Sequence, residues 1–202
     1  MTALEVADWR RQTTALYARV REATDLFAAH DEWRRGRDEL FARHPASPLL
    51  PHDRDAFTGL PVRPYDLDWR FELPLLDAAP VRIEVETGTD GIVPFQRIGA
   101  VEVPGVGSLD VWRLASYGGG LFLPVRDGLA GISTYGGGRY VLDTVKGADL
   151  GSGTSPNSLV IDFNFAYNPS CAYDPAWACP LAPAGNTTAV DIPVGERYFG
   201  AH

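Results

Sequence analysis

The stretch Val81-Arg82-Ile83-Glu84-Val85-Glu86 decides the fold class, because apolar and charged residues alternate along it. Successive side chains of a β-strand point to opposite faces, so this alternation is typical of a strand with one buried face. Trp69-Arg70-Phe71-Glu72-Leu73 alternates in the same way. The sequence after Tyr65 therefore predicts β-structure.

Five further strand candidates follow at short intervals, with Gly, Pro and Asp clusters between them and no intervening helix. They cover residues 96–103, 109–114, 121–125, 139–142 and 159–163. Strands at this spacing predict an antiparallel β-barrel or sandwich. The glycine runs at 118–120 and 136–138 mark turns or places where two backbones approach closely.

The first forty residues or so predict two helices instead. Thr2 and Glu5 have the spacing of a capping box, which marks a helix start. A second helix is expected from about Asp31, and Pro45 and Pro48 end it. Apolar residues fall on roughly one face of the first helix, at Trp9, Leu16, Tyr17, Val20 and Phe27.

The predicted fold is mainly β, of the α+β class: an antiparallel β-barrel or sandwich preceded by two N-terminal helices. We expect a helical segment over residues 1–44 and a β-rich domain over residues 45–202, which together form one compact domain. Residues 163–188 are rich in Asn, Tyr, Pro and Cys and have no period. Their aromatic side chains argue against disorder, so we expect a long ordered C-terminal loop.

Charge and composition argue against several classes of function. The formal net charge is -8, whereas proteins that bind nucleic acids or anionic membranes need a basic face. No apolar stretch reaches the length of a membrane span, and the N-terminus lacks the apolar core of a signal peptide. We therefore expect a soluble cytoplasmic protein with reduced cysteines that binds neither nucleic acid nor membrane.

Polar residues at the end of the last predicted strand form one part of a candidate site. If residues 159–163 form a strand, Asp162 and Asn164 point to one face, and Phe163 and Phe165 point to the other face, toward the core. The Asp and Asn would then reach solvent, a barrel mouth or a buried polar network. The alternative is that they pin the loop through hydrogen bonds to its backbone.

The other part is Tyr135-Gly136-Gly137-Gly138-Arg139-Tyr140. Three glycines let the backbone come close to a ligand, and the planar guanidinium of Arg139 suits a carboxylate or phosphate. The run lacks the Gly-Lys-Ser/Thr end of a P-loop, which argues against nucleotide binding. The alternative is a glycine-rich turn in which Arg139 pairs with an acid such as Asp143 or Asp162.

Cys171 and Cys179 are eight positions apart, which is neither the spacing of a redox Cys-x-x-Cys motif nor that of a zinc knuckle. No histidine lies near them, so we expect no metal site and see no base that would activate a nucleophilic thiol. Three interpretations stay open: small buried thiols, a disulfide that pins the loop, or a redox-sensing pair.

Together these residues predict a site for a small molecule, for binding or catalysis, where Tyr135–Arg139 meets Asp162–Tyr173. Asp162 and Tyr135 are candidates for proton transfer, and Lys146, the only lysine, is a candidate amine. The candidate ligand contacts are Arg139, Gly137, Asn164, Tyr167, Asn168, Tyr173 and Asn186. The residues indicate no particular cofactor and leave open whether the protein is an enzyme.

A second hypothesis is a non-catalytic interaction module. The polar cluster would then be a structural loop network, and the N-terminal helices would bind a partner or form a homodimer. Trp9, Tyr17 and Trp33 would be the contact residues, because large aromatic side chains dominate many interfaces.

A longer series of residues resembles a known family. It comprises 134–140, Asp162-Phe163-Asn164, 166–169, Cys171-Ala172-Tyr173, Cys179-Pro180-Leu181, Pro183, Asn186, Gly195-Glu196 and the earlier segments 57–61 and 65–70. This series is similar to the bacterial family called domain of unknown function 1684, over roughly residues 30–198. The chain looks like a short form that lacks an N-terminal insert of longer members. The resemblance implies a β-rich fold and a common C-terminal site, with no catalytic assignment.

Overall fold

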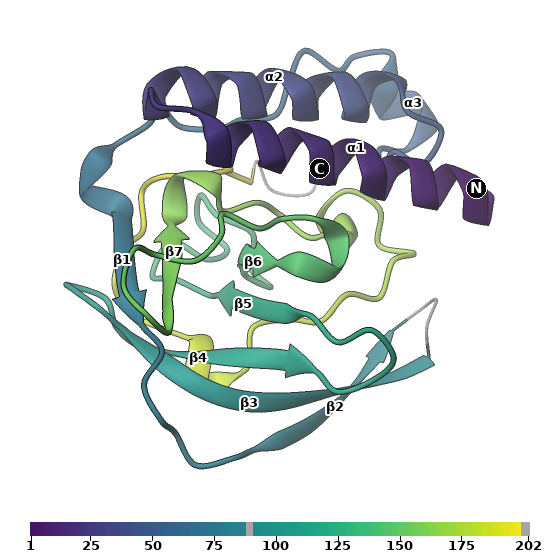
Figure 1. Cartoon of the computed structure of the whole chain (residues 1–202). Helices are drawn as coiled ribbons and strands as arrows, with labels where there is room; N and C mark the ends of the chain where they lie inside the picture. The colour runs from purple at the N-terminus through teal and green to yellow at the C-terminus, as the bar shows by residue number, and fades with distance from the viewer. Residues whose placement is uncertain (88–90, 199–202) are drawn as a thin grey trace.

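Two long helices lie side by side across one side of a β-rich body (Figure 1). The computed structural model describes residues 1–87 and 91–198. The helices are α1 (Ala3–Glu22), α2 (Leu26–Arg43) and the short α3 (Pro51–Arg54). The predicted capping box starts α1, since Thr2 Oγ1 accepts a hydrogen bond from the Glu5 N–H and the Glu5 carboxylate accepts one from the Thr2 N–H. None of the described helices is both long and apolar enough to cross a bilayer.

The start of α2 is held by Asp25, whose carboxylate accepts hydrogen bonds from the N–H groups of Phe27 and Ala28 at 3.0 and 3.1 Å. These two donors have no partner inside the helix, so the cap satisfies them. Replacing Asp25 with alanine is expected to lower the free energy of unfolding by about 1 kcal/mol. Urea denaturation measures this loss, and Asp77→Ala, at an exposed position, is the control. An equal loss in both variants would contradict the role of the cap.

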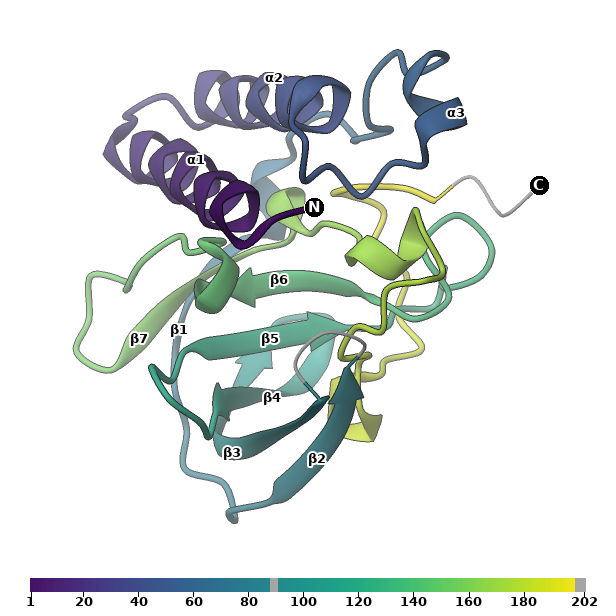
Figure 2. The same ribbon diagram turned by 90° about the vertical axis from the view of Figure 1, so that its right-hand side faces the viewer.

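The strands form two antiparallel sheets. Strand β1 pairs with β7, and the other five strands pair in the order β2-β3-β4-β5-β6. The strands are β1 (Arg70–Pro74), β2 (Arg82–Thr87), β3 (Gly91–Val103), β4 (Gly107–Leu114), β5 (Leu121–Val125), β6 (Arg139–Asp143) and β7 (Ser158–Asp162). In Figure 2 the larger sheet runs from β6, next to the helices, to β2, farthest from them. The predicted mainly β fold with two N-terminal helices is confirmed, and among the described residues the larger sheet stays open at β2 and β6.

Two apolar clusters account for most of the core. One packs side chains of β3 to β7 around Phe163 and Ile192, and the other joins the helices to the β-rich part. At the centre of the second, the Trp33 ring lies 5.1 Å from the Phe165 ring and Tyr17 lies 6.5 Å from Trp33. The helices therefore cover the chain's own loop with their aromatic faces.

The polypeptide turns sharply after β7, which ends one residue before the strand predicted over residues 159–163. Phe163–Phe165 is a 3-10 turn, η3, and the Asp162 carboxylate accepts the hydrogen bond of the Asn164 N–H at 3.0 Å. Both phenylalanines are buried as expected, but Phe163 packs in the first cluster and Phe165 in the second. A local cap thus overrides the alternation of the sequence, because Asp favours a turn at this position.

Candidate functional site

The segments 135–139 and 162–173 meet along β6. Tyr140 exchanges two backbone hydrogen bonds with Tyr167, at 2.8 and 3.0 Å. At the other end, the hydroxyl of Tyr135 lies 3.5 Å from the carbonyl oxygen of Cys171 and 3.6 Å from its sulfur. Residues that are 27 and 36 positions apart in the sequence thus line one stretch of the molecule.

Cys171 and Cys179 bring their thiols together at this stretch. Cys171 lies in the 3-10 turn η4 (Ser170–Ala172), and both cysteines are free and half-buried. The thiol of Cys171 donates a hydrogen bond to the Cys179 sulfur, and this bond is the main reason why the pKa of Cys179 is lowered to about 6. Burial of Cys179 raises its pKa, whereas the charge of Lys146 and backbone N–H groups lower it further. The same hydrogen bond, followed by burial, raises the pKa of Cys171. The hydrogen bonds that the Cys179 sulfur receives therefore favour its thiolate form.

Lys146 is the cation beside Cys179. It ends the 3-10 turn η2 (Thr144–Lys146), and its backbone N–H donates a hydrogen bond to the capping carboxylate of Asp143 at 3.3 Å. Its amine lies 5.5 Å from the centre of the Tyr140 ring and 3.8 Å from an Asp143 oxygen, and its side chain is 40% exposed. The structure thus brings together the predicted amine, Tyr135 and the two thiols. Sequence analysis missed that the hydrogen bond from the second thiol, with a smaller effect of the lysine charge, could lower the pKa of a cysteine without a histidine.

The guanidinium of Arg139 is bound by other residues of the same chain. It is 1% exposed and pairs with Asp127, whose side chain is equally buried. It also donates hydrogen bonds to the carbonyl oxygens of Val194, of Glu196 at 3.2 Å and of Ile192 at 3.0 Å. This is the alternative in which Arg139 pairs with an acid of its own chain, and the acid is Asp127 rather than Asp143 or Asp162. The sequence contained no signal for Asp127, because the pair joins the first residue of β6 to the loop after β5.

Asp162 and Asn164 form a buried polar joint between β7, α2 and the segment before β1. The Asp162 carboxylate accepts hydrogen bonds from the Tyr65 hydroxyl and the Asn164 amide, both at 2.8 Å. Asn164 also bonds the backbone of Asp66, and its carbonyl oxygen lies 3.1 Å from Nε2 of His30. Burial raises the pKa of Asp162, and the hydrogen bonds from Asn164 and Tyr65 oppose it.

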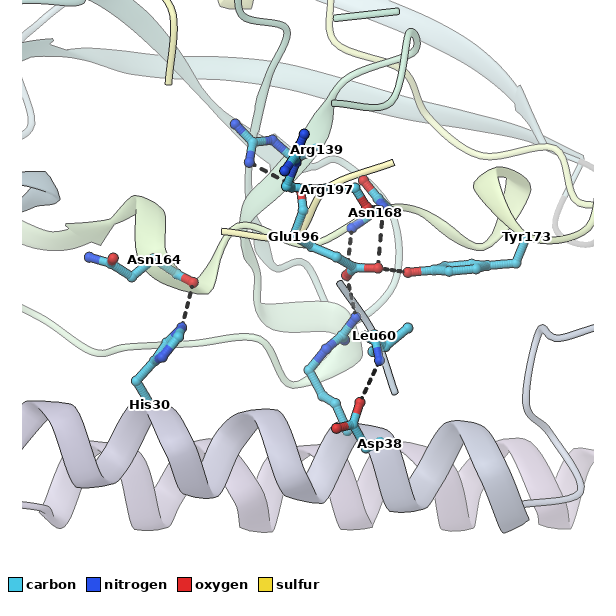
Figure 3. A network of polar contacts seen from close by, with 10 residues as sticks. His30, Asp38, Leu60, Arg139, Asn164, Asn168, Tyr173, Glu196 and Arg197 are labelled. Carbon is cyan, nitrogen blue, oxygen red and sulfur yellow. Dashed lines mark hydrogen bonds and ion pairs between the residues drawn. The ribbon is translucent and has the colours of Figure 1, made fainter. Parts of the chain in front are cut away.

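Glu196 is the centre of a second buried network (Figure 3). Its carboxylate is 0% exposed and accepts hydrogen bonds from Arg37 at 2.7 Å, from the backbone and side chain of Asn168 at 3.2 Å each, and from the Tyr173 hydroxyl. Burial raises the pKa of Glu196, and Arg37 and Asn168 lower it. Two predicted ligand contacts, Asn168 and Tyr173, thus bind a carboxylate of the same chain.

Arg37 of α2 was missed by sequence analysis. Its guanidinium carbon lies 5.1 Å from the centre of the Trp33 ring, 5.2 Å from that of Phe41 and 4.9 Å from that of Tyr167. Trp33, Arg37 and Phe41 are four residues apart, so they share one helix face. A charge in the middle of an aromatic stripe was the available signal for a buried ion pair.

The remaining predicted ligand contacts also bind groups of the chain. Tyr167 donates a hydrogen bond to Asp143 at 3.3 Å. Asn186, which is 0% exposed, accepts one from the Trp112 indole at 2.8 Å and donates to two backbone carbonyls. A Cβ on Gly137 would lie 2.7 Å from the Tyr135 ring, so this glycine lets the tyrosine fold back over its own turn. Their contacts to a ligand stay predictions.

Two hollows lie away from the thiols. One, of about 480 Å³, lies between α1 and the end of α2 and is lined by Leu4, Glu5, Asp8, Gln12, Glu39, Leu40, Arg43, His44 and Pro45. The other, of about 130 Å³, lies next to Arg63, Ser133 and Pro193. Within residues 1–87 and 91–198 no three His, Cys, Asp or Glu side chains are grouped so that they could hold a metal ion.

A protein-family model matches residues 55–197, which is most of the chain. The chain belongs to the family described as protein of unknown function (DUF1684). It is also similar to an uncharacterized protein of Haloarcula marismortui whose solution structure was determined by NMR. The two share 32% sequence identity over 84% of this chain and 92% of the other, with a TM-score of 0.59. No curated protein matches the chain.

The DUF1684 match places the thiol cluster inside the family region. Tyr135, Lys146, Cys171 and Cys179 all lie between residues 55 and 197, as does Glu196. Helices α1 and α2 lie outside this range, together with Arg37 and the larger hollow. Both thiols therefore lie in the part of the chain that the family model matches.

Proposed function

We propose that this DUF1684 protein binds small electrophilic molecules where Tyr135–Arg139 meets Asp162–Tyr173, and reacts with them through the sulfur of Cys179. The observation that carries the proposal is that the Cys179 sulfur receives hydrogen bonds from the Cys171 thiol and from the backbone N–H groups of Ser170 and Cys171, while the charge of Lys146 acts on it. The expected affinity for anionic molecules then rests on Lys146, since the guanidinium of Arg139 is engaged by Asp127.

The electrostatics support a nucleophilic sulfur. A thiolate is the reactive form of cysteine, and an ordinary cysteine has a pKa of about 8.5. With a pKa of about 6, Cys179 is mostly thiolate at neutral pH. The ionisable groups around it are the Cys171 thiol, the Lys146 amine, the Tyr135 and Tyr140 hydroxyls and the Asp143 carboxylate. Hydrogen bonding and the lysine charge outweigh burial because Cys179 keeps contact with solvent.

Tyr135 supports the proposal as a hydrogen-bond donor. Burial, followed by its contact with Cys171, raises the pKa of Tyr135. The hydroxyl therefore keeps its proton at neutral pH and can donate to a sulfur or to a ligand oxygen. Of the predicted proton-transfer residues, it is the one that lies beside the thiols, whereas Asp162 lies in the buried joint with Tyr65.

The rate of alkylation by iodoacetamide tests the proposal. We expect Cys179 to react with a pH profile whose midpoint lies near pH 6, because its pKa is about 6. At pH 6 it should react roughly tenfold faster than an ordinary cysteine, since the larger thiolate fraction outweighs the lower intrinsic nucleophilicity. Mass spectrometry of the tryptic peptides assigns the modified residue, and urea-unfolded protein is the reference.

Two variants sharpen this test. Lys146→Gln is expected to raise the midpoint of the pH profile for Cys179 alkylation. It should also slow alkylation by the anionic iodoacetate more than alkylation by the neutral iodoacetamide. Lys146→Arg keeps the positive charge and is the control. Cys179→Ser removes the fast reaction. A midpoint near pH 8.5 in the native protein, or equal alkylation of both cysteines at pH 6, would overturn the proposal.

Two of the three contact residues that the sequence suggested for an interaction module are buried within the chain and are not available to a partner. Tyr17 is 1% exposed and Trp33 is 0% exposed, because both pack on Phe165 of the same chain. Trp9 lies against the rings of Phe41 and His44 at 5.6 and 5.3 Å. The aromatic face of the helices is thus used within the chain, and nothing in these residues favours a partner over the thiol chemistry.

A further inference from the structure

We propose that Cys171 and Cys179 form a dithiol site that exchanges with small disulfides, with Cys179 as the attacking sulfur and Cys171 as the resolving one. This inference rests on the proposed function, because it uses the same sulfur of Cys179. It goes further by naming the substrate class, a small disulfide, and the fate of the adduct. The sequence spacing alone does not indicate it, since the two cysteines are eight positions apart.

The geometry supplies what an exchange site needs. A resolving thiol has to reach the sulfur that has been attacked, and the Cys171 thiol is already hydrogen-bonded to Cys179. Backbone N–H groups of Ser170 and Cys171 also face the Cys179 sulfur, so both thiols are anchored at the turn η4. Both side chains are half-buried, so a small disulfide can reach them from solvent.

The proposed reaction has two steps. The Cys179 sulfur attacks one sulfur of R–S–S–R, whose S–S bond breaks and whose electron pair leaves with RS⁻, so that Cys179 carries a mixed disulfide. Cys171 then loses its proton and attacks the Cys179 sulfur, which expels the second RS⁻ and forms the Cys171–Cys179 disulfide. Two electrons pass from the protein to the small disulfide. The two RS⁻ become RSH by taking one proton from Cys171 and one from solvent.

The order of attack follows from the hydrogen bonds that each sulfur receives: Cys179 from the Cys171 thiol and from two backbone N–H groups, and Cys171 from the Tyr135 hydroxyl. The hydrogen bond to the Cys179 thiolate, followed by burial, raises the pKa of Cys171. The first step removes this thiolate, so its effect on Cys171 disappears when Cys171 has to ionise. The Tyr135 hydroxyl, 3.6 Å from the Cys171 sulfur, lowers the pKa of that thiol. Tyr135 is therefore a positioning residue that stabilises the resolving thiolate.

The test uses one equivalent of dithiobis(nitrobenzoate), an anionic aromatic disulfide whose released thiolate is coloured. We expect the reduced full-length protein to release two equivalents of nitrothiobenzoate, and its mass to fall by two hydrogens. Cys171→Ser should release one equivalent and keep the adduct, whereas Cys179→Ser should react slowly. Circular dichroism checks that each variant is folded, and the result for the unmodified protein depends on no variant.

The outcomes separate the two proposals. Release of one equivalent and a stable adduct on Cys179, together with an alkylation midpoint near pH 6, would overturn the exchange site and leave the nucleophilic thiol standing. Slow reaction of Cys179 with both reagents would overturn both. Tyr135→Phe is expected to slow the second release severalfold and leave the first unchanged; equal rates of the second release would remove Tyr135 from the proposal.

Discussion

Replacing Arg139 with methionine is expected to lower the free energy of unfolding by about 3–5 kcal/mol. The substitution leaves Asp127 as an uncompensated charge, and the side chains of both residues are 1% exposed. It also removes the donors that satisfy the carbonyl oxygens of Ile192, Val194 and Glu196, which connect the C-terminal segment to β6. Methionine fills a similar volume, so the loss reports the polar contacts more than packing.

Urea denaturation of matched variants measures this effect. Arg82→Met is the control, because Arg82 forms a surface pair with Glu84 in which the side chains are 64% and 61% exposed. We expect it to change the free energy of unfolding by less than about 0.5 kcal/mol. Adding Asp127→Asn to Arg139→Met should recover part of the loss, because the unpaired charge disappears. A loss below about 1 kcal/mol in Arg139→Met would contradict the structural role of this pair.

Replacing Arg37 with methionine is expected to cost about 3–5 kcal/mol near pH 8, because Glu196 then remains buried without a cation. The cost should shrink as the pH falls. Burial raises the folded-state pKa of Glu196 above its unfolded value, and loss of Arg37, which lowers that pKa, raises it further. Stability from such a group is fully present below its unfolded pKa of about 4.3 and is lost as the pH rises through its folded pKa.

Urea denaturation of Arg37→Met and the unmodified protein at several pH values between 5 and 8 tests this. Arg34→Met is the control on the same helix, since Arg34 pairs with Asp31 at the surface with side chains 44% and 62% exposed. We expect the control to lose less than about 0.5 kcal/mol at every pH. A loss in Arg37→Met that is independent of pH would show that ring contacts, and not the buried charge of Glu196, dominate.

Much of the fold was accessible from local patterns. The alternation at 81–86 lies within one residue of β2, and the capping box of Thr2 and Glu5 marks the start of α1. These patterns act over a few residues, so the sequence contains them completely. The start of β3 was placed five residues late, because Pro94 falls inside a strand that reaches from Gly91 to Val103.

The candidate site was accessible only in part. The segments around Tyr135 and Cys171 stand out by composition, and the structure brings them together. The roles within them could not be assigned, because the acids that pair with Arg139 and Arg37 lie elsewhere in the chain. Burial removes competition from water, so a buried cation is engaged by the carboxylate that packing brings to it, whatever the distance in sequence.

The sequence by itself determined the order of helices and strands and the concentration of tyrosines, asparagines and cysteines near the C-terminus. Only the tertiary structure decided that Cys171 and Cys179 are hydrogen-bonded to each other, and that Arg37 and Glu196, 159 positions apart, form one ion pair. The physical reason is that periodicity specifies which face of an element is buried, whereas charge pairing depends on which faces meet. That meeting is set by the packing of the whole core.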